Sequence, residues 1–87
     1  MEDFAKELGI RKQGSLKGKQ LVIELEGSDE YSRMYTILDK SKLLTLQQNK
    51  TVITTDRSEL VYEGDEFMVQ LIGDMKNNRY EVIIEEK

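Results

Sequence analysis

The side chains that most often perform chemistry in proteins are missing from this chain of 87 residues, which contains no cysteine and no histidine. Their absence excludes a Cys–His or Ser–His–Asp nucleophile and any thiolate or imidazole metal site. It also excludes a disulfide framework, so nothing in the sequence indicates an oxidising compartment. Carboxylates remain as the candidates for acid–base chemistry.

Pairs of carboxylates occur in two segments, as Glu24 with Glu26 and as Glu81 with Glu85. Two carboxylates that flank a cleft can act as acid and base. Here they alternate with apolar residues, which is typical of the solvent-facing side of a strand, and no positioned partner accompanies them. We therefore expect no enzyme activity, no metal and no cofactor.

The glycine-rich segment 14–19, Gly-Ser-Leu-Lys-Gly-Lys, invites comparison with a phosphate-binding loop. Its spacing is one residue short, and Gln20 stands where a serine or threonine would bind magnesium. The predicted order is helix, loop, strand instead of strand, loop, helix. We interpret the segment as a glycine-rich connection.

Basic residues gather in the same part of the chain, with no acidic residue between Glu7 and Glu24. Lysine and arginine side chains on a loop can contact phosphates, with an affinity that falls as salt rises. Binding of single-stranded nucleic acid through this arm, residues 11–19, is therefore one alternative function. The residues that would make the contacts are Arg11, Lys12, Lys17 and Lys19.

Acidic residues give the chain its net charge of −4, and their excess lies in residues 45–87, with five basic and nine acidic side chains. Rows of carboxylates can imitate the phosphates of DNA. A second alternative function is therefore an acidic DNA-mimic inhibitor of a nucleic-acid-binding protein. The candidate residues are Glu24, Glu26, Asp29, Glu30, Glu63, Asp65, Glu66, Glu81 and Glu85.

The length fits one domain over residues 1–87 with a single small core. No apolar run approaches the ~20 residues needed to span a membrane. The acidic N-terminus lacks the long apolar region of a signal peptide. We expect a soluble cytoplasmic protein.

Residues 1–9 are predicted to form a short helix with its end at Gly9, because glycine commonly follows the last helical turn. A helix of two turns is unstable alone, so it must dock on the rest of the domain. Residues 10–18 are predicted to be a basic loop. The apolar residues of the helix fall on one stripe, which contains Met1, Phe4, Ala5 and Leu8.

From Lys19 onward the apolar period changes from 3.6 residues to two, which predicts antiparallel strands over residues 19–87. Residues 31–38 are ambiguous, because their apolar spacing fits a helix whereas tyrosine, threonine and isoleucine favour strands. We assign them to a strand. The predicted fold is mainly β, or α+β at the margin: a short N-terminal helix and a six- to seven-stranded antiparallel meander forming a small barrel or sandwich.

Two turns set the pairing of the first predicted strands. A four-residue loop at 39–42 and a two-residue turn at 49–50 give registers that agree with each other. Both registers place the same residues on the core face, which are Tyr35, Ile37, Leu44, Leu46 and Ile53.

Two further hairpins complete the predicted sheet. A turn at 64–65 pairs Tyr62 with Phe67. The hairpin around 77–78 has two possible registers, one with a two-residue turn and one with a six-residue loop over 73–78. Both registers leave the same residues on the core face, which are Phe67, Val69, Leu71, Tyr80, Val82 and Ile84.

The opposite face of the predicted sheet is also partly apolar. It is covered either by another part of the chain, such as the N-terminal helix, or by a partner. We predict a small non-enzymatic protein-interaction module that self-associates or binds a protein partner through this face. The predicted protein-binding residues are Met34, Leu38, Leu43, Val52, Met68, Ile72 and Ile83.

Overall fold

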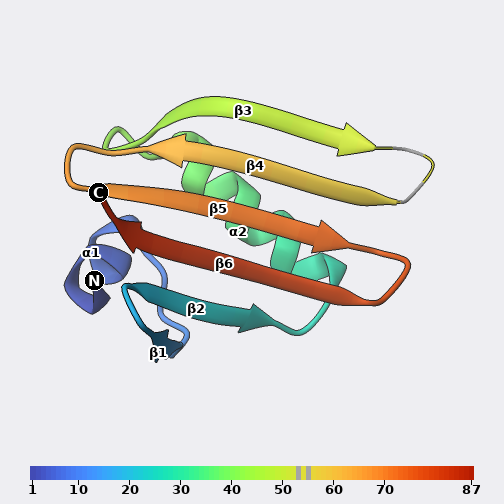
Figure 1. Ribbon diagram of the computed structural model, residues 1–87, viewed down its shortest axis with the longest axis horizontal. Coiled ribbons are helices and arrows are strands. Elements are labelled where there is room, and N and C mark those ends of the chain that lie inside the picture. The colour runs from blue at the N-terminus through green and yellow to red at the C-terminus, as the bar shows by residue number, and fades with distance from the viewer. Residues whose placement is uncertain (53, 55) are drawn as a thin grey trace.

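The computed structural model describes residues 1–52, 54 and 56–87. In this part of the chain, six strands form a single antiparallel sheet in the order β1-β2-β6-β5-β4-β3, accompanied by two helices (Figure 1). The elements are α1 (Glu2–Leu8), β1 (Ser15–Lys17), β2 (Gln20–Leu25), α2 (Ser28–Lys40), β3 (Thr45–Val52), β4 (Arg57–Glu63), β5 (Phe67–Asp74) and β6 (Arg79–Glu86).

The connectivity combines a meander with one crossover. Strands β3 to β6 follow one another across the sheet, and β6 then pairs with β2. Helix α2 links β2 to β3 and crosses behind the strands that separate them (Figure 1). The mainly β class, the N-terminal helix and the six antiparallel strands are confirmed. The sheet does not close into a barrel, and its second layer is α2 instead of a second sheet.

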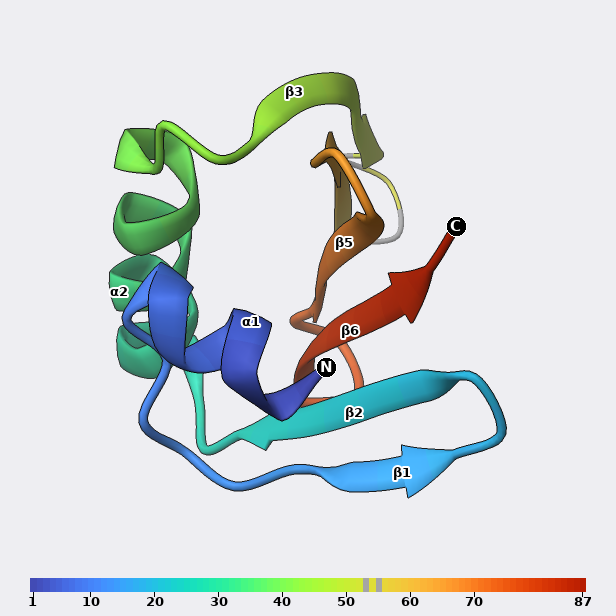
Figure 2. The same ribbon diagram turned by 90° about the vertical axis from the view of Figure 1, so that its left-hand side faces the viewer.

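The sheet curls around the two helices, which both lie on its concave side (Figure 2). Strand residues on this side alternate with outward-facing residues, as the sequence period predicts. From α2, Met34 and Leu38 pack onto the concave face, and Ala5 and Leu8 do so from α1. The buried strand residues of this core are Leu21, Ile23, Leu25, Leu60, Tyr62, Val69, Leu71, Tyr80, Val82 and Ile84.

The strand predicted at residues 31–38 is wrong, because Ser28–Lys40 form α2. The spacing of Tyr31, Met34 and Leu38 places them on one side of a helix, where they contact the sheet. Burial of this stripe outweighs the strand propensity of the individual residues. Tyr31 approaches Gly73 of β5 so closely that a Cβ on the glycine would lie 2.8 Å from its ring.

The predicted turn at 49–50 is also wrong, because β3 runs through it and pairs with β4. Within β3 a bulge follows Leu46, which lies opposite Tyr62. The predicted partner of Leu46, Ile53, lies outside the described residues. The core face predicted from these turns was therefore wrong for Tyr35, which is exposed on α2. Leu46 shares the side of its partner Tyr62 but is 43% exposed on the edge strand, so it is not part of the core.

The later hairpins have the predicted faces but different registers. Tyr62 lies opposite Val69 instead of Phe67, and Asp74 opposite Arg79 closes the last hairpin around a four-residue loop. Each register differs from the predicted ones by two residues. A shift of two residues keeps every side chain on its face, which is why the core face was predicted correctly here.

The N-terminal helix is confirmed, and Gly9 ends it with a positive φ of 94°. The backbone N–H of Gly9 donates to the carbonyl of Lys6, and that of Ile10 donates to Ala5. The predicted basic loop 10–18 is not wholly irregular, because Ser15–Lys17 form β1 and pair with β2. None of the described helices is long and apolar enough to cross a membrane.

Candidate protein-interaction surface

Three of the predicted protein-binding residues are buried. Ile72 is only 9% exposed, although its place in β5 alternates with the core residues. Met34 and Leu38 are only 6% and 1% exposed, because they pack from α2 into the core. Their assignment to an interaction face was wrong, since it depended on a strand at residues 31–38. Leu43 is exposed in the connection between α2 and β3, outside the sheet.

Ile72 and the other predicted residues share the convex face of the sheet, which Figure 1 views directly. Met68 and Ile72 alternate with the core residues of β5, and Ile83 does so on β6. Val52 lies on the same face at the end of β3, by its register with Arg57. No described element covers this face (Figure 2).

A central row of neighbouring residues crosses the convex face. Val22 on β2 lies opposite Ile83 on β6, which lies opposite Gln70 on β5, and Val61 on β4 follows. Val22 is buried and the others are half-buried. The row is apolar except for Gln70, and we infer that the stems of longer flanking side chains cover much of it.

Glutamates lie on both sides of the central row. On one side Glu24 is directly opposite Glu81, and Ile72 separates this pair from Glu59. On the other side Met68 lies between Glu85 and Glu63. We define these residues as the convex glutamates: Glu24, Glu59, Glu63, Glu81 and Glu85.

Only part of this negative charge is compensated within the protein. Glu63 forms an ion pair with Lys87 at 3.0 Å, and Gln20 donates a hydrogen bond to Glu85 at 3.3 Å. Among the described residues, Glu24, Glu59 and Glu81 form no ion pair.

The basic residues of the convex face lie at its margins. Lys17 and Lys50 are on the two edge strands. Arg57 and Arg79 lie at one end, where Arg57 pairs with Asp74 at 3.8 Å. The centre of the face is therefore acidic around an apolar row.

The edges of the sheet are less suited to pairing with another strand. β1 has three residues, and β3 contains both a bulge and Lys50. Short edge strands, bulges and edge lysines all discourage strand addition. The convex face is the more open surface for a partner.

The predicted nucleic-acid-binding residues do not gather in one place. Lys12 donates to Glu30 at 3.0 Å near the start of α2. This hydrogen bond and one from the backbone N–H of Glu26 lower the pKa of the Glu30 carboxyl. Lys17 and Lys19 flank the β1–β2 turn, at the opposite end of β2 from α2.

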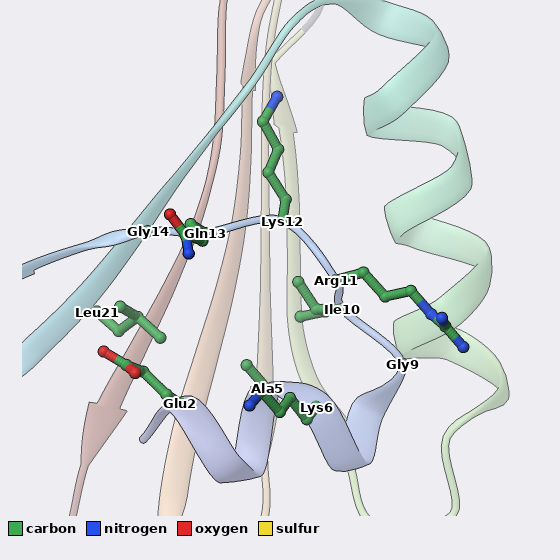
Figure 3. Close-up of a pocket in the computed structure, with 10 residues that line it drawn as sticks. All are labelled: Glu2, Ala5, Lys6, Gly9, Ile10, Arg11, Lys12, Gln13, Gly14 and Leu21. Atoms are coloured by element: carbon green, nitrogen blue, oxygen red, sulfur yellow. The ribbon is translucent and has the colours of Figure 1, made fainter.

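A cavity of about 740 Å³ lies between α1, residues 9–14 and β2 (Figure 3). Its apolar wall includes Ala5, Ile10 and Leu21, and all three are buried. In Figure 3 the side chains of Arg11 and Lys12 extend away from Ala5 and Leu21. The predicted phosphate-binding residues Arg11 and Lys12 therefore do not converge in this cavity.

The predicted DNA-mimic residues fall in three places. Glu24, Glu63, Glu81 and Glu85 are on the convex face. Glu26, Asp29 and Glu30 lie in the β2–α2 connection and the first turn of α2, and Asp65 and Glu66 lie in the β4–β5 connection. Glu59, on the same face, was missed, although its alternation with Leu60 indicates an outward direction. One convex acidic surface is therefore formed by residues from β2, β4 and β6.

The described residues offer little chemistry beyond this charge. No three of their His, Cys, Asp or Glu side chains are placed to hold a metal ion. The buried Tyr62 hydroxyl has no hydrogen-bond partner among them, and burial raises the pKa of Tyr62 to about 12. Comparison with known proteins finds no matching family model, no matching curated protein and no matching solved structure.

Proposed function

We propose that the chain is a non-enzymatic protein-binding module whose convex sheet face binds a basic surface of a partner protein. The observation that supports this proposal is the direct opposition of Glu24 and Glu81 on an uncovered face. Like charges directly opposite each other in a sheet are destabilising. A lysine or arginine from a partner would relieve that repulsion and gain two acceptors.

The dimensions of the face suit a protein partner. The molecule measures 34 × 24 Å in the plane of Figure 1. This outline is comparable to the ~800 Å² that each partner contributes to a standard interface. The central row would supply the middle of the contact, and the convex glutamates would form its charged rim.

Self-association through the same face is less favourable. Two copies placed face to face would bring Glu24 and Glu81 of one close to the acidic centre of the other. Uncompensated like charges at an interface oppose binding. We therefore expect a monomer in solution, and light scattering at several concentrations measures this directly.

The DNA-mimic hypothesis is a special case of this proposal, in which the basic partner itself binds nucleic acid. The same convex glutamates would then occupy its phosphate-binding surface. Direct nucleic-acid binding through Arg11, Lys12, Lys17 and Lys19 is a weaker candidate, because these residues are dispersed and Lys12 is paired with Glu30.

Affinity capture with matched variants tests the proposal. The face variant Glu24→Gln/Glu81→Gln removes two charges, and the control variant Glu26→Gln/Asp29→Asn removes two charges at the start of α2. Immobilised wild-type and control proteins are expected to retain the same basic partner from a lysate of the source cells. The face variant and 0.5 M salt are expected to release it. A partner that binds the face variant and the wild type equally contradicts the proposal.

A further inference from the structure

A groove of about 800 Å³ lies at the end of the molecule where α1 meets the β4–β5 loop (Figure 1). The connection from α2 to β3, the beginning of β3 and Lys87 complete its walls. We call this cavity the end groove. It is distinct from the centre of the convex face and shares only Glu63 with the convex glutamates.

The lining of the end groove contains an aromatic pair. The rings of Phe4 and Phe67 are stacked with their centroids 4.4 Å apart. Both side chains are only partly buried, and the nearby Leu43 is 46% exposed. The groove can therefore bury an apolar side chain from a ligand.

Carboxylates surround this apolar surface. Asp3 and Glu7 line the groove from α1, and Asp65 and Glu66 line it from the β4–β5 loop. All four residues are exposed, and none forms an ion pair within the described part of the chain. Lys42 also lines the groove, so five carboxylates face two lysines, Lys42 and Lys87, and the lining keeps an excess of negative charge beside its apolar residues.

The protein itself already places a lysine against this acidic wall. The ammonium of Lys87 lies 3.0 Å from Glu63, and the backbone N–H of Lys87 donates to the carbonyl of Glu66. This arrangement shows which chemical group the wall can hold. The four other carboxylates remain available for a second cation.

The bulge in β3 adds a polar group to the same groove. The bulge lies between Leu46 and Gln48, and Gln47 lines the cavity. Bulges redirect side chains near binding sites. The Gln47 amide can both donate and accept hydrogen bonds, which suits recognition of a peptide backbone.

We propose that the end groove binds a peptide segment in which a lysine or arginine stands beside an apolar residue. The apolar side chain packs on Phe4, Phe67 and Leu43, and the cation interacts with Asp65, Glu66 and the α1 carboxylates. The described residues provide no metal-binding group of carboxylates, so an organic cation fits the site better than a metal ion. This proposal is independent of binding at the convex face.

An NMR titration with three short peptides tests the groove. The probes are acetyl-Leu-Lys-Leu-Lys-amide, the uncharged acetyl-Leu-Gln-Leu-Gln-amide and the non-apolar acetyl-Ser-Lys-Ser-Lys-amide. Only the first is expected to shift the amide signals of Phe4, Gln47 and Glu66 in a saturable way. Equal shifts with the uncharged peptide, or no saturable shift with any peptide, would overturn the proposal.

Matched variants then locate the binding. The groove variant Asp65→Asn/Glu66→Gln is expected to weaken binding of the first peptide about fivefold, since two exposed carboxylates that would contact its cations are lost. The face variant and the control variant remove the same net charge and are expected to leave the affinity within about twofold. Equal weakening by all three variants would show that the affinity depends only on the net charge of the protein, and this would contradict the proposal. Circular dichroism confirms that each variant is folded.

Discussion

Glu24 and Glu81 lie directly opposite each other on neighbouring strands of the sheet. Side chains in such a pair have Cβ atoms about 4.5–5.5 Å apart. Neither carboxylate has an ion-pair partner among the described residues. A sequence usually agrees with its fold at every level, and local conflicts concentrate at functional sites. This like-charge pair lies beside the central row of the surface to which we assign partner binding.

Replacement of either glutamate by glutamine is expected to stabilise the free protein. Glu81→Gln should raise the free energy of unfolding by a few tenths of a kcal/mol at low salt, because it removes a like-charge pair. Glu24→Gln should act in the same direction, and the double variant should gain less than the sum. Urea denaturation of the wild type, the two single variants and the double variant gives the double-mutant cycle that measures this interaction. The opposite result, a loss of stability in both single variants, would show that the two carboxylates do not repel each other.

Tyr62→Phe is expected to leave the protein equally stable or more stable at neutral pH. The hydroxyl is buried without a hydrogen-bond partner in the described structure, so its removal ends a desolvation cost. Burial is the main cause that raises the pKa of Tyr62 to about 12 from 10.0, and the Asp39 carboxylate adds to it.

The raised pKa of Tyr62 also predicts a dependence on pH. Between pH 10 and about 12 the unfolded chain ionises Tyr62 while the folded protein keeps it neutral. The wild type should therefore lose stability relative to Tyr62→Phe as the pH rises through this window. Below pH 10 the difference between the two proteins should stay constant. Parallel curves up to pH 12 would contradict the raised pKa.

Gly73→Ala is expected to destabilise the protein by about 1–3 kcal/mol, as overpacking of a core does. A Cβ at this position would lie 2.8 Å from the Tyr31 ring, which also packs 5.7 Å from the Tyr80 ring. The cost should fall when Tyr31→Leu is introduced as well, because the smaller side chain leaves room. Thermal unfolding measures both effects. If Gly73→Ala lowers stability equally with and without Tyr31→Leu, the Tyr31 ring is not the source of the clash.

Lys12→Met is expected to raise the pKa of Glu30 toward its ordinary value. The hydrogen bond from Lys12 is the largest cause of the lowered pKa, and the backbone N–H of Glu26 is the next. Because the second donor remains, the pKa should stay somewhat low. Since a lowered pKa stabilises the folded state above it, acid should remove less stability from the variant. NMR titration of the Glu30 carboxyl carbon in both proteins checks this, and identical titration curves would contradict it.

The alternation of apolar residues was the most reliable signal in the sequence. Val69 and Leu71 share the core face with Val82 and Ile84, as predicted. The predicted core face was correct although the predicted registers were not, because a shift of two residues does not change the side of the sheet to which a side chain points. Turn residues alone did not determine loop length. The β4–β5 hairpin has a loop over residues 64–67 instead of a two-residue turn at Gly64-Asp65, because Glu63 pairs with Met68.

Two segments required information that local patterns do not contain. Residues 28–40 combine helical spacing with strand-forming residue types, and only the concave sheet decides between them by burying Met34 and Leu38. The edge strand β3 is exposed along its whole length, so burial imposes no alternation on residues 45–52. The convex glutamates were only partly predicted, because their grouping depends on the pairing of β2 with β6.

Zero-length cross-linking measures the central claim most directly. A carbodiimide joins a carboxylate to a lysine amine that it contacts, and mass spectrometry identifies both residues. In the complex with its captured partner, the chain is expected to form cross-links from Glu24, Glu81 or Glu85 to lysines of the partner. The control variant Glu26→Gln/Asp29→Asn should give the same cross-links. Partner cross-links confined to carboxylates outside the convex face would contradict the proposed binding surface.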